Sequence, residues 1–220
     1  MVNEQIVHGF PLENNGDIRV ITCDNNRRLI QRQLDACREE RRPYVFVTPT
    51  MNVQPLRRLL VPVSMLEEET YKAEICTYLA RKTGAHIILL QANDYGSHAR
   101  QNVQRIVTHI EKINERLIKD LTVQRTVLQQ SGPTGEAGLT GAAGPITYEI
   151  VLARKDSFGL IREAAERQRD FQHDLLILTA SRDYGLDDIL FGPPERHAIR
   201  KSPVPVLLVN PREDLFSLCD

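Results

Sequence analysis

The segment Arg58-Leu-Leu-Val-Pro-Val-Ser64 is apolar throughout its centre and does not alternate between apolar and polar residues. Continuous apolar runs of this length are typical of strands buried on both faces, as in a parallel sheet covered by helices. Similar short runs, rich in β-branched residues, recur before and after it along the chain. They span residues 18–22, 44–48, 86–91, 147–153, 175–179 and 204–209.

Helical patterns separate these runs. In residues 102–120, apolar side chains recur every three or four positions, which predicts an amphipathic helix packed by one face. Residues 67–82, followed by Gly84 at the place of a helix C-cap, predict a second helix, and residues 158–169 predict a third. The alternation predicts βαβ units in an α/β fold: an open, mostly parallel five-stranded sheet with helices on both faces, Rossmann-like, preceded by an extra βαβ segment.

Composition narrows the class of protein. The 220 residues carry a formal net charge of −1, which gives no electrostatic basis for binding nucleic acid. No apolar run approaches the roughly 18 residues that cross a bilayer, and the first residues lack the pattern of a signal peptide. We therefore expect a cytoplasmic protein with no nucleic-acid partner and no direct membrane insertion. The four scattered cysteines show no metal-ligand spacing and indicate reduced, structural thiols: Cys23, Cys37, Cys76 and Cys219.

One insertion, residues 131–146, breaks the strand–helix alternation. Glycine occupies positions 132, 135, 138, 141 and 144, a strict Gly-x-y period flanked by Pro133 and Pro145. A collagen triple helix requires three chains and many more triplets, so the pattern predicts a solvated loop. A docking or trimerisation segment is the alternative.

Several segments resemble signatures of the universal stress protein family. Residues 58–64 resemble its first strand, which usually ends in aspartate, and residues 160–165 with 174–179 resemble its third helix and fourth strand. Gly185-Leu-Asp-Asp-Ile-Leu-Phe-Gly192 resembles its glycine-containing loop, and Pro203-Val-Pro-Val-Leu-Leu-Val209 its last strand. The resemblance implies the fold shared with the adenine nucleotide alpha hydrolases, here over residues 57–211, with 212–220 as a tail.

An internal repeat extends the resemblance toward the N-terminus. Arg42-Pro-Tyr-Val-Phe-Val-Thr-Pro49 parallels Val204-Pro-Val-Leu-Leu-Val-Asn-Pro211, and each follows a basic helical stretch. Residues 1–56 are therefore interpreted as the last part of a first stress-protein copy, so that the chain would be a truncated tandem with one full copy. An unrelated βαβ extension at the sheet edge is the alternative.

The family's nucleotide site fits this sequence poorly. In nucleotide-binding members, backbone N–H groups of a glycine loop cradle the phosphates, because only glycine lets the backbone approach closely. Loss of two or three contacts, each worth roughly 1.5–3 kcal/mol, would weaken binding by about three decades, so we expect no bound ATP and no cofactor. The family's loop positions fall on Thr179, Arg182, Gly192 and Pro193, of which Gly192 alone conforms, and its other positions on Val63, Ser64 (in place of the aspartate) and Asp156.

These patterns predict a regulatory or interaction module and not an enzyme, since no nucleophile elbow, Walker loop or zinc-protease motif is present. Ser64 and Asp156, at neighbouring strand ends, could line a small-ligand pocket. The resemblance implies a homodimer through the last strand, at Val204, Val206, Leu207, Leu208 and Val209, together with an unidentified protein partner. Two alternatives are a cytosolic regulatory domain of a membrane transporter (an antiporter or permease) and a nucleotide-binding sensor or weak ATPase in which Arg182 replaces the glycine loop.

Overall fold

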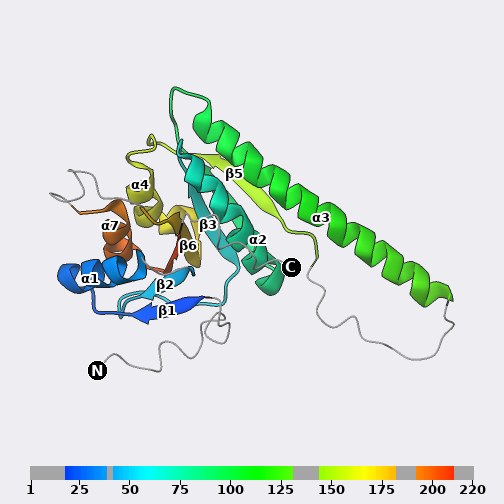
Figure 1. Ribbon diagram of the computed structural model, residues 1–220, viewed down its shortest axis with the longest axis horizontal. Helices are drawn as coiled ribbons and strands as arrows, with labels where there is room; N and C mark the ends of the chain where they lie inside the picture. Colours follow the sequence, from blue (N-terminus) through cyan, green and yellow to red (C-terminus); the bar gives the residue numbers. More distant parts are fainter. Residues whose placement is uncertain (1–17, 39–41, 131–143, 182–191, 211–220) are drawn as a thin grey trace.

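The computed structural model describes residues 18–38, 42–130, 144–181 and 192–210, and these form one seven-stranded sheet with helices on both faces (Figure 1). The strand order is β1-β2-β7-β6-β3-β4-β5. All neighbouring strands are parallel except β2 and β7. The strands are β1 (Arg19–Thr22), β2 (Tyr44–Val47), β3 (Arg58–Val63), β4 (His86–Gln91), β5 (Tyr148–Leu152), β6 (Leu175–Thr179) and β7 (Val206–Val209).

The predicted five-stranded parallel sheet is confirmed as β7-β6-β3-β4-β5, and the extra βαβ segment is joined to it. The helices lie where the apolar periodicity predicted them, with Gly84 ending α2 at a φ of 72°. They are α1 (Arg27–Arg38), the 3₁₀ helix η2 (Glu67–Tyr71), α2 (Lys72–Thr83), α3 (His98–Gln130), α4 (Leu160–Glu166), α5 (Gln168–Phe171) and α7 (Pro194–Lys201).

Two apolar cores lie on opposite faces of the sheet. Along β3, Leu59, Val61 and Val63 contribute to one core, while Leu60 contributes to the other. Helices α2 and α3 cover the first face, and α1, α4 and α7 cover the second. Burial on both faces explains why the strands are continuously apolar in sequence.

The single antiparallel junction, between β2 and β7, has a symmetric register. Val45 lies opposite Leu207, and the repeat of the sequence makes these two residues equivalent. Equivalent residues of the two βαβ units also form equivalent backbone hydrogen bonds, β1 with β2 in one unit and β6 with β7 in the other. Arg19 N donates to Pro43 O and Leu176 N to Pro205 O, both at 3.0 Å, while Cys23 N donates to Val47 O at 3.1 Å and Ala180 N to Val209 O at 2.9 Å.

This junction occupies the edge of β7 through which the resemblance implied pairing with a second subunit. One edge of β7 pairs with β6 and the other with β2 of the same chain. Val206, Leu207, Leu208 and Val209 are all buried, as is Val204 just before the strand. A strand from another subunit could reach β7 only by displacing β2.

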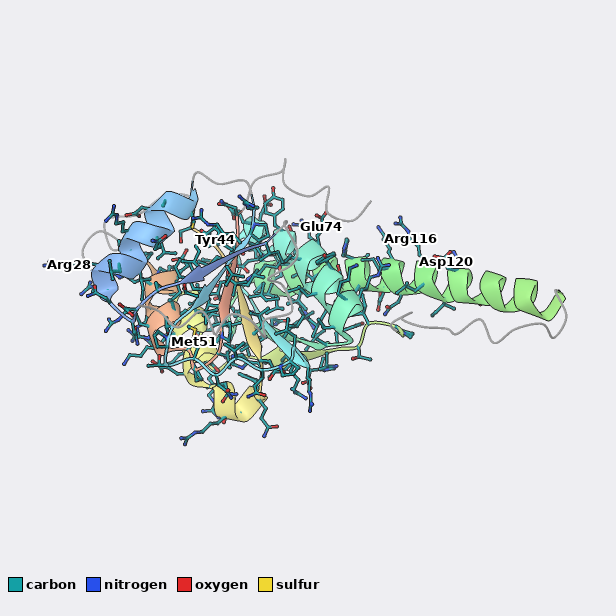
Figure 2. All side chains as sticks on the ribbon, turned by 90° about the horizontal axis from the view of Figure 1, so that it is seen from below. Arg28, Tyr44, Met51, Glu74, Arg116 and Asp120 are labelled. Atoms are coloured by element: carbon teal, nitrogen blue, oxygen red, sulfur yellow. The ribbon has the colours of Figure 1, made fainter. Side chains whose placement is uncertain are left out.

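Helix α3 is longer than the apolar periodicity predicted. It spans 33 residues, and its second half extends beyond the sheet in both views (Figures 1 and 2). Arg116 and Asp120 lie on this projecting part (Figure 2). Within the described residues, no helix combines the length and apolar character needed to span a membrane. The Gly-x-y segment that follows lies outside the described residues, apart from Gly144 and the residues after it.

Three of the four cysteines lie in the described part of the chain, and each is a buried free thiol. Burial raises the pKa of Cys23 to about 11 and that of Cys76 to about 12, and it also raises the pKa of Cys37. Thiols held in the neutral form are poor nucleophiles, which fits the structural role expected of them.

We expect Phe46→Ala to lower the free energy of unfolding by about 3–5 kcal/mol, because Phe46 is fully buried in the second core. Its ring packs against Tyr44, with the centroids 5.8 Å apart. Urea denaturation should show a single transition, and Leu29→Ala, on the exposed side of α1, should change little. A loss below about 1 kcal/mol would mean that residues 18–47 do not share the main core.

Candidate functional site

The candidate site lies where β3 and β6 separate at their carboxyl ends. From β3 the chain proceeds outward to β4 and β5 and then returns to β6 on the other side, which makes this the topological switch point of the sheet. Open α/β sheets bind ligands at such points. A cavity of about 330 Å³ occupies it, lined by residues of the β3–η2 loop, the β5–α4 loop, the end of β6 and the start of α7.

The structure brings together part of the predicted site. Ser64 and Thr179 line this cavity, and Gly192 and Pro193 precede the first residue of α7, Pro194, which also lines it. Val63 is buried in the first core and does not line the cavity. Arg182 lies outside the described residues. Asp156 lines a different cavity, so Ser64 and Asp156 do not meet in one pocket.

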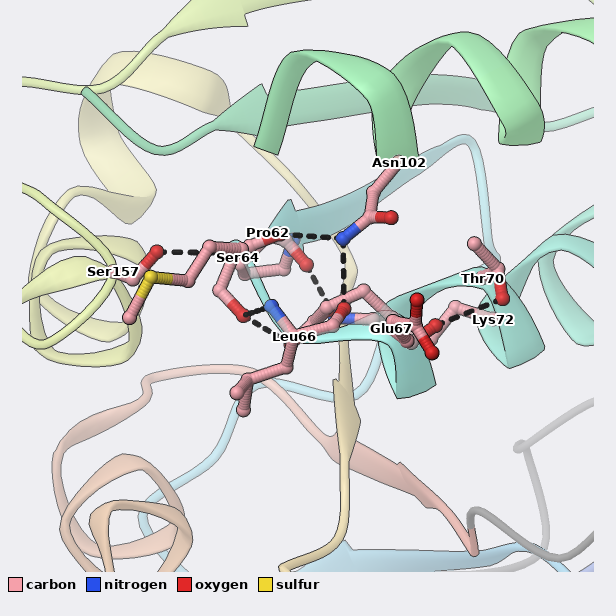
Figure 3. Close-up of polar contacts among 10 residues, drawn as sticks. Pro62, Ser64, Leu66, Glu67, Thr70, Lys72, Asn102 and Ser157 are labelled. Atoms are coloured by element: carbon pink, nitrogen blue, oxygen red, sulfur yellow. Dashed lines mark hydrogen bonds and ion pairs between the residues drawn. The ribbon is translucent and has the colours of Figure 1, made fainter. Parts of the chain in front are cut away.

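Ser64 belongs to a buried polar network that the sequence analysis missed (Figure 3). Its Oγ donates to Glu69 Oε1 at 2.8 Å, and Glu69 forms an ion pair with Lys72. The ammonium of Lys72 also donates to the carbonyl oxygen of Pro62 in β3. From α3, the amide of Asn102 donates to the carbonyl oxygens of Ser64, at 3.0 Å, and of Leu66, at 2.7 Å.

The burial of its charged side chains determines which interactions this network can make. Lys72 is 1% exposed and Glu69 is 7% exposed, so their charges compensate each other inside the protein. The ammonium is therefore committed to Glu69 and Pro62 and is a poor candidate for binding an anion. The network ties the end of β3 to η2, α2 and α3, and it fixes the wall of the cavity.

Among the residues that the structure describes, the opposite wall of the cavity has few free hydrogen-bond donors, and the hydroxyl of Thr179 is one of them. The backbone N–H and the hydroxyl of Ser181 both donate to Glu195 Oε1, each at 2.5 Å. Pro193 and Pro194 have no N–H, although the first turn of a helix is where donors would face an anion. The carboxylate of Glu195 also places negative charge at this helix end.

Gly192, the one position that fits the family's glycine loop, has a packing role. Its φ is 84°, which favours glycine. The guanidinium of Arg196 lies across its α-carbon, only 1.3 Å from where a Cβ would stand. Arg196 also donates to Gln31 Oε1 at 2.9 Å, which joins α7 to α1.

Asp156 lies at the neighbouring strand ends, where a cavity of about 1130 Å³ opens between the loops after β4 and β5. Its carboxylate accepts a hydrogen bond from Gly159 N at 3.1 Å. Nearby, Glu163 accepts from the backbone N–H groups of Arg154, at 3.0 Å, and Lys155, at 2.8 Å, and pairs with Arg167. Burial by itself would raise the pKa of Glu163, but these partners hold it below its usual range.

Chemically, neither cavity contains a recognisable catalytic set in the residues that the structure describes. No group of three or more His, Cys, Asp or Glu side chains among them could hold a metal ion. The hydroxyl of Ser64 donates to a carboxylate that is itself paired with Lys72, so Glu69 is not free to act as a base.

We expect Lys72→Met to lower the free energy of unfolding by about 3–5 kcal/mol, because it leaves Glu69 charged and buried without its cation. The double variant Lys72→Met/Glu69→Leu should recover most of that loss, since it removes both charges. Urea denaturation of the two single variants and the double variant measures the coupling. Lys82→Met, exposed on the same helix, is the matched control, and equal stability of Lys72→Met and Lys82→Met would contradict the role assigned to the pair.

Comparison with solved structures shows the fold of this chain in other proteins. A universal stress protein from Archaeoglobus fulgidus DSM 4304 aligns with a TM-score of 0.55 and 15% identity, covering 95% of this chain and 66% of its own. This chain thus spans slightly less than two thirds of that protein. A functionally unknown protein from Pseudomonas aeruginosa PAO1 aligns with a TM-score of 0.46 and 12% identity, covering 91% of this chain and 65% of its own.

A shorter neighbour aligns over less of this chain. The universal stress protein UspA from Lactobacillus plantarum aligns with a TM-score of 0.36 and 14% identity, covering 72% of this chain and 99% of its own. A comparison with curated proteins finds no significant match. The profile of the universal stress protein family matches residues 55–210, most of the described sheet and both candidate cavities. The chain therefore belongs to the universal stress protein family.

Proposed function

We propose that this chain is a cytoplasmic regulatory module of the stress-protein type that acts without a bound nucleotide and without catalysing a reaction. Membership of the family supports a stress-type module. The observation that carries the rest of the proposal is the hydrogen bonding at the start of α7. There Glu195 takes both donors of Ser181, and two successive prolines supply none.

The electrostatics of the cavity argue in the same direction. A bound polyphosphate would bring several negative charges toward Glu195, Glu68 and Glu69, which lie at this cavity or on the helix end beside it. The buried cation of the cavity wall, Lys72, already pairs with Glu69. Moving it to a phosphate would leave a buried carboxylate uncompensated, at a cost of several kcal/mol.

The free energy of phosphate binding that is lost determines whether nucleotide affinity is only weakened or falls too low to matter. Each charge-assisted hydrogen bond to a phosphate contributes roughly 1.5–3 kcal/mol. The two prolines and the occupied Ser181 remove about three such contacts, which corresponds to a loss of about three decades in affinity or more. A site with a micromolar dissociation constant would become millimolar or weaker, too weak for the chain to act as a nucleotide sensor.

Isothermal titration of the purified chain with Mg-ATP, repeated with ADP and AMP, tests this proposal. We expect no heat of binding and no change in the thermal midpoint of unfolding, because at the start of α7 Glu195 takes the donors of Ser181 and the two prolines supply none. A ligand at 100 times its dissociation constant would stabilise the fold by about 2.7 kcal/mol, which a thermal scan detects.

The control is the same titration with magnesium alone. Saturable heat with any of the three nucleotides would overturn the proposal and make the chain a nucleotide sensor. If binding occurred and Glu195→Gln strengthened it, the helix end would be the place where the phosphates lie.

A further inference from the structure

A surface with exposed apolar side chains lies beside the candidate site, over the carboxyl ends of β3, β4 and β5. It combines large exposed apolar side chains with cationic ones around the 1130 Å³ cavity. Phe158 is 86% exposed and Tyr95 is fully exposed, although aromatic side chains of this size usually bury most of their surface. We call this surface the carboxyl-edge patch and define it by Met65, Tyr95, Phe158, Arg154, Lys155 and Arg162.

The loops that carry the patch are held together by hydrogen bonds. Asp94, in the loop after β4, accepts hydrogen bonds from the N–H of Ser157 at 2.9 Å and from its hydroxyl at 2.5 Å. The same hydroxyl accepts from Met65 N at 2.9 Å, in the loop after β3. Asn93 N donates to Lys155 O at 2.9 Å. Three loops from three strands are thus fixed, so the patch needs little ordering when it binds a partner.

The basic side chains of the patch are free to pair with a partner, whereas most of the acidic side chains already have contacts within the chain. Arg154, Lys155 and Arg162 are exposed and form no salt bridge within the described part of the chain. The carboxylates of the same cavity are largely engaged: those of Asp94 and Glu163 accept the hydrogen bonds given above, and Glu166 lies 3.4 Å from His197. The side chains exposed to a partner are therefore two aromatic rings, a methionine and three cations without a salt bridge, beside two exposed carboxylates, Asp156 and Glu166, that each have a contact within the chain.

We propose that the carboxyl-edge patch docks a segment of a partner protein in which an apolar side chain lies next to one or more carboxylates. This inference rests on the proposed function, since it names the surface through which an interaction module would act. The apolar side chain packs against Tyr95 and Phe158, and the carboxylates pair with Arg154, Lys155 or Arg162. Aromatic and arginine side chains are the ones that most often dominate the binding energy of protein interfaces.

Charge favours a protein over a nucleic acid as the occupant. The cavity is also lined by Asp94, Asp156, Glu163 and Glu166, so its four basic side chains are balanced by four acidic ones. Nucleic-acid sites need a net positive face, because the phosphate backbone supplies most of the affinity. A protein segment can place one carboxylate beside one cation and an apolar group beside the rings, which suits a surface of balanced charge.

Selection from a library of random linear peptides, displayed on phage and panned against the immobilised full chain, tests the proposal. We expect the enriched peptides to share an apolar residue next to an acidic one. Synthetic versions of these peptides, labelled and measured by fluorescence polarisation, should bind Tyr95→Ala and Arg162→Glu at least about tenfold more weakly than the unchanged chain. Tyr95 is the residue to change first, because Phe158 lines both cavities and Tyr95 lines the larger one.

Leu29→Ala is the matched control, since Leu29 is an exposed apolar residue on α1, away from the patch, and peptide affinity should be unchanged. All three variants alter exposed side chains, so their thermal midpoints should match that of the unchanged chain. Absence of enriched peptides, or enriched peptides that bind the patch variants equally well, would overturn the proposal. So would a single-stranded oligonucleotide that competes for the same surface, or self-association by sedimentation that Tyr95→Ala abolishes.

The outcomes separate this inference from the proposed function. Peptide binding together with a heat of nucleotide binding would contradict the nucleotide-free module and leave the patch intact. A silent nucleotide titration without any peptide binding would contradict the patch alone.

Discussion

The rest of the structure depends on β7 having both of its edges paired inside the chain. Its four residues are buried on both faces, and a buried strand whose N–H and C=O groups lack partners is strongly destabilised. The antiparallel register with β2 satisfies that requirement. As a result β1, α1 and β2 belong to the main sheet, α1 packs beside α7, and the two cores continue across the junction. The guanidinium of Arg196, which lies on Gly192 and reaches Gln31, is a further consequence of this arrangement.

The sequence predicted the elements of the fold well, because parallel strands covered on both faces leave a distinctive apolar run. All seven runs are strands, and the repeat of residues 42–49 and 204–211 marks two equivalent βαβ units. The pairing between those units was not predictable. An edge strand and a central strand can have the same apolar pattern, and the resemblance to the family implied that β7 pairs with a second subunit. The length of α3 was also missed, because the apolar periodicity was followed over residues 102–120 alone, whereas the helix spans His98–Gln130.

The candidate site was predictable only where a family position could be compared. Ser64, Thr179, Gly192 and Pro193 do lie at the switch point of the sheet. The residues that determine its chemistry were missed, since Glu69, Lys72 and Glu195 are charged and stand on helices whose charged residues normally face solvent. A buried ion pair three residues apart cannot be distinguished in sequence from an exposed one. Gly192 was matched to the family's glycine loop, and in the structure the side chain of Arg196 lies against it.

The two cavities at the carboxyl edge share lining residues, and this links the proposed absence of nucleotide binding to the proposed docking of a partner. Ser157 and Phe158, in one loop, line the smaller cavity, while Phe158 also lines the larger one. Here Ser157, Asp94 and Met65 are bonded to one another, and Ser181 is bonded to Glu195, so the donors that a ligand would use hold the loops in place. A surface fixed in this way loses little conformational entropy when it binds, and its exposed aromatic rings suit the proposed recognition of another protein.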